Sequence, residues 1–344
     1  MPMIIDSICA GSDISKEDSY HMMSRILNGS ISEEEKIRLL RGLAAKGETD
    51  DEISGILRAM RDAATTVHIP DAIDVCGTGG DGLQTVNIST ATVFVATSLG
   101  CRVAKHGNRS SSGGVGSADI FESIGCNLQA GPKEVASCME KMNMCFMFAP
   151  RYHPSMKNIA NARASIGKRT VFNLLGPLCN PACVKRQLIG VSSLDMLKRI
   201  PKILLKNGSE KIITVISDTG MDELSTAGSC HMLETDSKGQ REHIISPKDL
   251  RLEECNISDL QVENKKALAS FIKAIDGSAS RAVCDTIALN AGAAMLVSGD
   301  CDNIKEGLEA ALESIESGKA MKQLRSYVKY CGSLEILERI CKDV

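Results

Sequence analysis

The chain has 344 residues, of which 43% are apolar and 24% charged, so it can bury a sizeable core and has room for two domains. Its net charge of −3 gives no broad electrostatic reason to expect nucleic acid or a membrane surface as a partner. No apolar run approaches the roughly 20 residues that span a bilayer. The N-terminus has no basic segment leading into a long apolar one, so we expect a cytoplasmic protein.

The 14 cysteines are scattered along the chain and none falls in a C-x-x-C pair. The closest spacing, Cys179 and Cys183, has no histidine near it in sequence. This pattern favours buried free thiols over a zinc site or disulfides.

Residues 1–67 predict a small helical domain. A helix is expected at about 15–28, where Ser15 can serve as its cap and Gly29 stops it. The segments 32–35 and 49–52 each carry a capping-box pattern before an amphipathic stretch, which predicts two further helices.

After Pro70, short β-branched segments alternate with helical ones, which is typical of an α/β domain with a mostly parallel or mixed sheet flanked by helices. Strands are predicted at 72–76, 101–107, 144–149, 186–192 and 211–217, and a hairpin at about 232–246. Helices are predicted at 87–100, 117–125, 194–208 and 305–326. Pro201 is expected to kink or split its helix.

The segment GTGGDG at 77–82 lies between a predicted strand and a predicted helix. Glycines allow the backbone to approach an anion, and backbone N–H groups at a helix start favour a phosphate. The segment also satisfies G-x-G-x-x-G, so a dinucleotide-binding unit is an alternative. The next strand ends in Lys105 rather than in an acid, which weakens that alternative without excluding it. A Walker A loop is excluded because no G-K-[ST] follows.

Three further segments carry candidate functional residues. The segment 105–117 follows a strand and combines Lys105 and Arg109 with small donors, which suits a diphosphate. Asp222 and Glu223 follow another strand and offer oxygen ligands that suit Mg²⁺. The segment 151–163 has a histidine and arginines that could hold an aromatic carboxylate, although the residues alone favour a surface helix with ordinary ion pairs.

Taken together, these segments resemble the anthranilate phosphoribosyltransferases over nearly the whole chain. The matching segments are GTGGDG at 77–82, NIST at 87–90, KHGNRS at 105–110, GSADIFESIG at 116–125, HPSMKNIANARASIGKRTVFNLLGPLCNP at 153–181 and MDEL at 221–224. The resemblance implies a helical domain of residues 1–67 plus about 153–182, and an α/β domain of 68–152 plus about 183–344. It also implies a homodimer.

The resemblance implies transfer of a phosphoribosyl group from 5-phosphoribosyl 1-diphosphate to anthranilate, with two Mg²⁺ ions. The implied contacts to the diphosphate substrate are Gly77, Gly80, Asp81, Thr85, Asn87, Ile88, Ser89, Thr90, Lys105, His106, Gly107, Asn108, Arg109, Ser110, Ser111, Ser112, Gly113 and Ser117. The implied contacts to anthranilate are Gly77, Asn108 and Arg163, with His106 and His153 nearby. The implied metal ligands are Ser89, Asp222 and Glu223.

No residue is an obvious general base, and Lys105 and Arg109 are expected to act electrostatically. Residues 113–116 read GGVG where many members have serines, which puts diphosphate affinity in question rather than the reaction. Three alternatives are a pyrimidine nucleoside phosphorylase, a non-catalytic paralogue that binds nucleic acid and an NADP enzyme. The acid pair and the weakly negative charge favour the transferase, with no nucleic acid and no membrane as partner.

Overall fold

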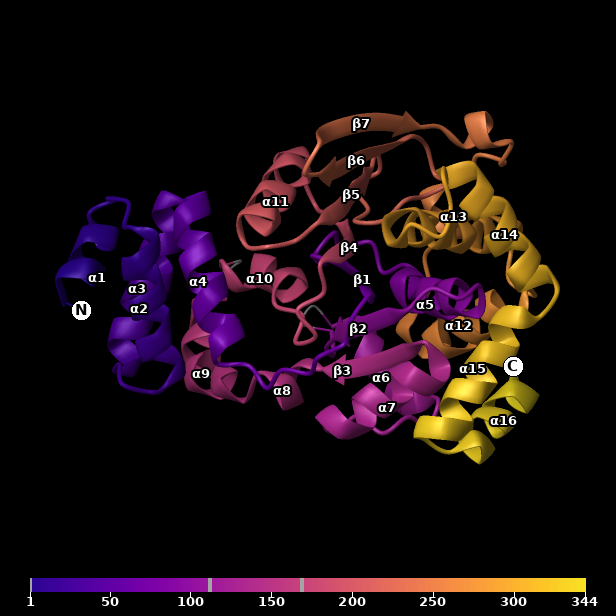
Figure 1. Ribbon diagram of the computed structural model, residues 1–344, viewed down its shortest axis with the longest axis horizontal. Helices are drawn as coiled ribbons and strands as arrows, with labels where there is room; N and C mark the ends of the chain where they lie inside the picture. The colour runs from indigo at the N-terminus through magenta and orange to yellow at the C-terminus, as the bar shows by residue number, and fades with distance from the viewer. Residues whose placement is uncertain (1, 111–112, 168–169) are drawn as a thin grey trace.

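Four helices form a bundle at one end of the molecule in a computed structural model that describes residues 2–110, 113–167 and 170–344 (Figure 1). They are α1 (Pro2–Cys9), α2 (Lys16–Leu27), α3 (Glu33–Lys46) and α4 (Asp50–Asp62). The three predicted helices are confirmed, with Ser15 accepting from the backbone N–H of Asp18 and with both capping boxes formed. The additional helix, α1, begins at Pro2 with no Ser, Thr, Asp or Asn before it, so it lacked the cap residue by which the other starts were predicted.

The α/β domain contains one seven-stranded sheet in the order β3-β2-β1-β4-β5-β6-β7. Its strands are β1 (Ile73–Gly77), β2 (Val103–Gly107), β3 (Met144–Phe148), β4 (Arg186–Gly190), β5 (Lys211–Ser217), β6 (Cys230–Asp236) and β7 (Gly239–Ile245). The first five are parallel, and β6 and β7 add an antiparallel hairpin at one edge. All five predicted strands and the hairpin are therefore confirmed, and the sheet is mixed.

From β1, the strands β2 and β3 are added toward one edge of the sheet, whereas β4 and β5 are added toward the other edge. Strands β1 and β4 are therefore neighbours although they are far apart in sequence. In an open parallel sheet, such a point leaves a crevice at the carboxyl ends of the strands where ligands bind. The segments that follow β1, β2 and β5 are the glycine loop, the segment 105–117 and the acid pair. The topology therefore brings these three predicted segments to one edge of the sheet.

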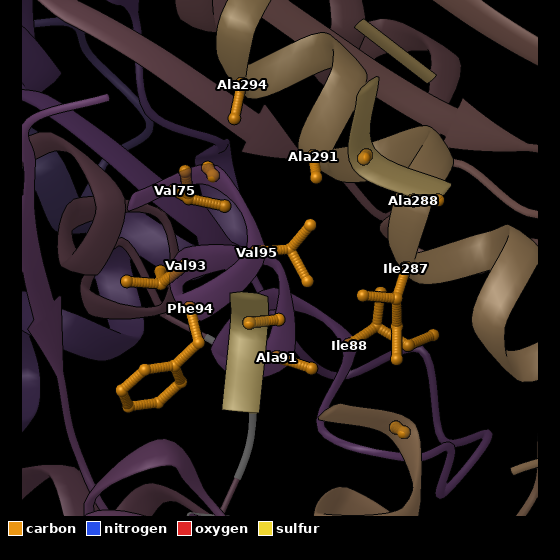
Figure 2. Close-up of a cluster of buried hydrophobic side chains, with 14 of the residues drawn as sticks. Val75, Ile88, Ala91, Val93, Phe94, Val95, Ile287, Ala288, Ala291 and Ala294 are labelled. Atoms are coloured by element: carbon orange, nitrogen blue, oxygen red, sulfur yellow. The ribbon is translucent and has the colours of Figure 1, made fainter. Parts of the chain in front are cut away.

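Alternating residues of the strands face two separate cores. On β5, Ile213 and Val215 belong to the core that contains α5 and α13, whereas Ile212 and Ile216 belong to the core shared with α11 and the bundle. Helices α5 and α13 pack against each other, and Figure 2 shows Ile88 and Val95 of α5 on the side that faces Ile287 and Ala291 of α13. This period of two is what a sheet covered on both faces requires.

The helices that come after the bundle either cover the sheet or, like α9, lie beside the bundle, and they extend to the C-terminus (Figure 1). Their bounds are α5 (Ile88–Ser98), α6 (Ser117–Ser123), α7 (Pro132–Met142), α8 (Ala149–Tyr152), α9 (Lys157–Ile166), α10 (Phe172–Leu178), α11 (Leu194–Lys206), α12 (Ala267–Asp276), α13 (Arg281–Ser298), α14 (Ile304–Glu316), α15 (Lys319–Cys331) and α16 (Leu334–Asp343). Short 3₁₀ turns are η1 (Pro154–Met156), η2 (Pro247–Leu250), η3 (Ile257–Asp259) and η4 (Asn264–Lys266). Among the described residues, no helix has the length and apolar character needed to cross a membrane.

Two helix predictions are corrected. The predicted helix 305–326 is two helices, because the chain turns at Gly318, whose φ of 74° belongs to the left-handed region. The helix that contains Pro201 is neither split nor ended there. Proline leaves the carbonyl of residue i−4, here Leu197, without its N–H partner, and the Thr214 hydroxyl donates to that carbonyl at 2.7 Å.

After β3 the chain returns to the bundle. Helix α9 packs against α3 and α2, and the Asn158 side chain donates to the carbonyl of Leu27 at 2.7 Å. Helix α10 follows, and its apolar side chains join the core that also holds those of α2 to α4. Two stretches far apart in sequence therefore surround one core at the end of the molecule where the bundle lies. All fourteen cysteines are free thiols, and eight of them are buried as expected, whereas Cys9 and Cys183 are exposed.

Candidate active site

The glycine loop begins where β1 meets β4. The N–H of Thr78 donates to the carbonyl of Gly190 at 2.9 Å, which continues the pairing of the strands into the loop. Gly79, Gly80 and Gly82 then adopt φ angles of 66°, 79° and 75°, which side-chain-bearing residues rarely adopt. The repeated glycines are therefore required by the backbone path, and this path turns consecutive N–H groups toward an anion-binding concavity.

The acid pair is held against this loop and against the start of α5. The Gly79 N–H donates to Asp222 Oδ2 at 2.6 Å, and the Ser89 N–H donates to Glu223 Oε1 at 2.9 Å. Burial, together with the nearby Asp81 carboxylate, raises the pKa of Asp222 to about 6. Burial and the Asp222 charge raise the pKa of Glu223 well above its usual value. The site thus gathers three carboxyl groups that repel one another.

Lys105 supplies a buried cation to the same place. Its ammonium donates to the carbonyl of Val75 at 2.8 Å and to Ser89 Oγ at 3.3 Å. Burial lowers the pKa of Lys105, while the neighbouring carboxylate of Asp74 opposes that shift. The Asp74 carboxylate also accepts from the N–H of His106 at 3.4 Å, so it supports both residues at the end of β2.

Asp119 organises the segment that follows β2. Its carboxylate accepts from the Gly116 N–H at 2.9 Å, from the Ser110 N–H at 3.4 Å and from the Arg109 guanidinium at 2.7 Å. Arg109 also forms an ion pair with Glu122 at 2.8 Å. Its charge is thus already engaged by two carboxylates of α6, so a role of Arg109 opposite a diphosphate stays a prediction.

A cavity of about 510 Å³ lies between the bundle side of the molecule and the ends of β1 and β2. This size suits a small aromatic ligand. The cavity is lined by Met60, Cys76, Gly77, Thr78, His106, Gly107, Asn108, Arg109, Ala149, Pro150, His153, Pro154, Met156, Lys157, Ala160, Arg163, Phe172, Asn173, Leu175, Gly176, Pro177 and Cys179.

Two pairs of side chains characterise the walls of the cavity. The His106 and His153 rings lie 5.2 Å apart between centroids, and the Arg163 guanidinium lies 4.9 Å from the centre of the Phe172 ring. Burial lowers the pKa of His106 to about 3, and the nearby His153 adds to this shift. Burial also lowers the pKa of His153 and that of Arg163. At neutral pH the two imidazoles are therefore neutral, whereas Arg163 is a cation that can pair with a carboxylate, as are Arg109 and Lys157 on the same lining.

Several buried polar atoms around the site have no hydrogen-bond partner among the described residues. They are Thr78 Oγ1 and His106 Nε2 on the cavity wall, and Asn87 Oδ1 and Asp74 Oδ2 beside the loops. Leaving such atoms unpaired costs about 1–3 kcal/mol each in a folded protein. A molecule bound in the cavity would be placed to supply partners for Thr78 Oγ1 and His106 Nε2.

The donor set also fits a magnesium ion. Asp222, Glu223 and Ser89 present hard oxygen atoms, and the repulsion among the carboxylates would be relieved by a divalent cation. In the described part of the chain, no three His, Cys, Asp or Glu side chains form a ready metal site by themselves. Mg²⁺ usually keeps waters and substrate phosphates in its shell, so it needs only a few protein oxygens.

Comparison with known proteins decides the family. Residues 2–64 match the model of the glycosyl transferase family helical bundle domain, and residues 69–321 match that of the α/β domain. The anthranilate phosphoribosyltransferase of Cenarchaeum symbiosum is 46% identical over 96% of this chain and 97% of its own length. The chain belongs to the anthranilate phosphoribosyltransferase family. It is therefore a transferase of the glycosyltransferase class.

Solved structures of the family agree with this membership. The Thermus thermophilus anthranilate phosphoribosyltransferase is 34% identical, with a TM-score of 0.88 over 95% of this chain and 98% of that chain. The Saccharomyces cerevisiae enzyme is 25% identical, with a TM-score of 0.83 over 92% of this chain and 93% of that chain, and it was solved in complex with PRPP and Mg. The dinucleotide-binding alternative fails, because α5 begins at Ile88, well beyond the glycines.

The structure brings nearly all predicted site residues to one edge of the sheet. Asn87 links the start of α5 to the second loop, since its amide donates to the carbonyl of Val115 at 2.9 Å. The Ile88 side chain is in the hydrophobic core, so only its backbone can face a ligand. Thr85 pairs with Gln261 in an isolated bridge, and Thr90 is buried. Ser111 and Ser112 lie outside the described residues.

Sequence reasoning missed several residues of the site. Asp74 and Asp119 support the loops, and Met60 lines the cavity. Thr78 and residues 176–179 also line it, and they lie inside the segments 77–82 and 153–181, in which no individual role was predicted for them. Asp119 carried a usable signal, because it stands three residues after the helix cap Gly116. The cavity residues carried none, since apolar side chains and a proline at the end of a helix are also what an ordinary core contains.

Proposed function

We propose that the two loops, the acid pair and the cavity form one active site. It transfers the phosphoribosyl group of 5-phosphoribosyl 1-diphosphate to the amine of anthranilate, giving N-(5-phosphoribosyl)anthranilate and pyrophosphate in a step of tryptophan biosynthesis. The observation that supports this most strongly is a pair of direct hydrogen bonds, which Asp222 accepts from the first loop and Glu223 accepts from α5, beside a cavity that contains Arg163. An anion site and an aromatic site thus adjoin.

The diphosphate substrate is assigned to the polar edge of the sheet. The N–H groups of the glycine loop and the start of α5 favour its phosphates, and Lys105 adds a buried positive charge. The assigned contacts are Gly77, Gly80, Asp81, Thr85, Asn87, Ile88, Ser89, Thr90, Lys105, His106, Gly107, Asn108, Arg109, Ser110, Gly113 and Ser117. Ser111 and Ser112 complete the proposal from outside the described residues.

The aromatic acceptor is assigned to the cavity. Gly77 and Asn108 belong to the loops and also line the cavity, so they stand at the boundary between the two substrates. Arg163 offers a planar fork that matches a carboxylate, and Phe172 offers an apolar face. The Saccharomyces cerevisiae enzyme has been solved with 4-fluoroanthranilate, which supports an aromatic amine as the acceptor.

Two magnesium ions are assigned to Ser89, Asp222 and Glu223. When bound, Mg²⁺ offsets the negative charge that develops on the departing pyrophosphate. The protein's own contribution is to hold both carboxylates in place, through the N–H groups of Gly79 and Ser89. Each preorganised electrostatic contact of this kind typically contributes about 10²–10³ in rate.

The reaction is a displacement at C1 of the ribose. The acceptor nitrogen forms a bond to C1 with its lone pair, the bond from C1 to the diphosphate oxygen breaks, and the nitrogen loses a proton. An aromatic amine is unprotonated at neutral pH, so the first step needs no base, and we assign none. The cavity supplies orientation, and Lys105 stabilises the charge on the leaving group.

The remaining assignments concern the whole molecule. We propose that residues 1–67 and about 153–182 form the helical domain, because α9 packs on α2 and α3. The remainder forms the α/β domain. The proposal also includes a homodimer and a cytoplasmic location.

Anthranilate fluorescence provides the direct test. The protein is incubated with 5-phosphoribosyl 1-diphosphate, Mg²⁺ and anthranilate, and loss of fluorescence should require all components and stop with EDTA. A folded protein that consumes no anthranilate would contradict the assignment. Thymidine with phosphate serves as the control substrate for a nucleoside phosphorylase and should give no product.

A further inference from the structure

One wall of the cavity has an unusual arrangement of hydrogen bonds. At the end of α10, three consecutive carbonyl groups each accept from a side chain of a different part of the fold. Gln187 of β4 donates to Pro177 at 2.8 Å, Arg61 of α4 donates to Leu178 at 3.0 Å, and the ring of His153 contacts the carbonyl of Cys179 at 2.9 Å. The final carbonyls of a helix have no partner within it, so these donors complete the wall.

Arg61 differs from the other two donors because it comes from the helical bundle. Its second nitrogen donates to the carbonyl of Asn207, the residue that follows α11, also at 3.0 Å. The two-pronged guanidinium thus joins the carboxyl ends of α10 and α11, where a cation is electrostatically favoured. Among the described residues, no carboxylate forms an ion pair with Arg61. Its charge is directed at these two carbonyls alone.

The position of this contact matters for the cavity. Met60, the residue before Arg61, lines the cavity from the bundle side, while Pro177 and Cys179 line it from the α10 side. The Leu178 carbonyl lies between these last two residues in the chain. A side chain that fixes Leu178 relative to α4 therefore sets the separation of opposite walls of the cavity.

We propose that Arg61 is a positioning residue for the aromatic acceptor: by holding the Leu178 carbonyl, it places the wall formed by residues 176–179 at the distance that fits the acceptor ring. The inference rests on the proposed function of the cavity. Because Arg61 is not among the residues that line the cavity, it acts through the wall. His153 strengthens the same wall, since a carbonyl only accepts and its Nε2 must therefore carry the hydrogen.

Docking of the bundle does not depend on Arg61 alone. Arg199 of α11 forms an ion pair with Asp50 of α4 at 2.6 Å, and Asn207 donates to Ser54 of α4 at 3.2 Å. These contacts remain when Arg61 is replaced. Loss of Arg61 is therefore expected to release the wall while the two parts of the molecule stay together.

The test compares Arg61→Gln and Arg61→Lys with Arg58→Gln. Arg58 is a matched control: it lies on the same helix, is half-exposed, pairs with Glu17 at 3.0 Å and stacks on Tyr20 inside the bundle. For each variant we would measure kcat and the KM of each substrate from anthranilate fluorescence. Amide hydrogen exchange of a peptide covering 172–183 gives a second readout that is independent of turnover.

The Arg61→Gln variant is expected to raise the KM for anthranilate about tenfold or more, with less than about a twofold change in the KM for the diphosphate substrate. Its wall peptide should exchange faster. For Arg61→Lys, the KM for anthranilate and the exchange rate of the wall peptide should lie between those of the wild type and of Arg61→Gln. An ammonium keeps the positive charge but has no planar fork to reach both carbonyls. The Arg58→Gln variant should match the wild type in every readout.

Two results would overturn the inference: unchanged acceptor KM with unchanged exchange in Arg61→Gln, or equal rises in both KM values. The wild-type protein in the same assay tests the proposed function separately. If the wild type consumed no anthranilate, the proposed function would fail. Exchange of the wall peptide, with and without anthranilate, would still decide whether Arg61 holds the wall.

Discussion

Gly190 lies so close to Asp222 that a Cβ atom on this glycine would overlap the carbonyl group of Asp222. Gly77, its partner on the adjacent strand, approaches the same residue, and a Cβ there would lie 2.5 Å from Asp222 Oδ2. Asp222 therefore packs directly against the backbone at the ends of β1 and β4, where no side chain stands between them. A side chain on either strand end would displace an atom of the candidate metal site.

Replacing Gly190 by alanine should damage both fold and activity. The overlapping atoms belong to the backbone of Asp222, so no side chain can rotate away, and overpacking of this kind costs about 1–3 kcal/mol. Urea unfolding should show a lowered midpoint, and turnover should fall. Gly131→Ala is the control, because a Cβ there would lie 3.7 Å from its nearest neighbours. Full activity in Gly190→Ala would contradict this expectation, because it would show that turnover does not depend on the present position of Asp222.

The double variant Asp222→Asn with Glu223→Gln should lose activity by at least about 10²–10³-fold. Its thermal midpoint without Mg²⁺ should be no lower than that of the wild type, because burial raises the pKa of both carboxyls and their charges therefore oppose folding. Asp218→Asn is the matched control, since Asp218 is exposed and pairs with His231 at 3.2 Å. Near-normal turnover in a folded double variant would refute the metal assignment.

Arg163→Ala should weaken binding of anthranilate specifically. A charge-assisted hydrogen bond contributes about 1.5–3 kcal/mol, which corresponds to a rise of about 10–100-fold in the KM for anthranilate. The KM for the diphosphate substrate should change little. Arg151→Ala, which removes an exposed arginine nearby, should leave both values as they are. If both KM values rose together in Arg163→Ala, the residue would be supporting the fold of α9 rather than the acceptor.

The stability of the protein should depend on His106 below neutral pH. Burial lowers the pKa of His106 to about 3, whereas a histidine in the unfolded chain has a pKa of about 6.5. Between these values the unfolded state binds more protons, so the contribution of His106 to stability is present above pH 6.5 and is lost as the pH falls. Relative to His106→Asn, the wild type should lose about 1 kcal/mol between pH 7 and pH 5.5.

Denaturant unfolding at both pH values measures this difference. The raised pKa values of Asp222 and Glu223 act in the opposite direction, because protonation of these carboxyls favours the folded state as the pH falls. They are present in both proteins and cancel in the comparison. Parallel pH profiles for wild type and variant would show that His106 is accessible to protonation in the folded state.

Local signals accounted for much of the fold. The capping residues at 15, 32 and 49 and the five parallel strands were predicted because caps, turns and apolar period depend on residues that are close in sequence. The same locality explains the errors. Helix 305–326 was predicted as one because helix-forming residues stand on both sides of a turn that is only Ser317 and Gly318. Pro201 was expected to disrupt a helix whose missing donor comes from Thr214, on the following strand.

The sequence by itself determined which segments carry chemistry: the glycine loop, the segment 105–117 and the acid pair at 222–223. Their residue types suit phosphate and Mg²⁺ whatever the fold around them. Only the tertiary structure decided that they meet, because the strand order places β1 beside β4 and sets Gly77 and Gly190 against Asp222. The tertiary structure also decided the cavity, whose walls come from α4, α9 and α10, since contacts between elements far apart in sequence leave no periodic pattern in any one of them.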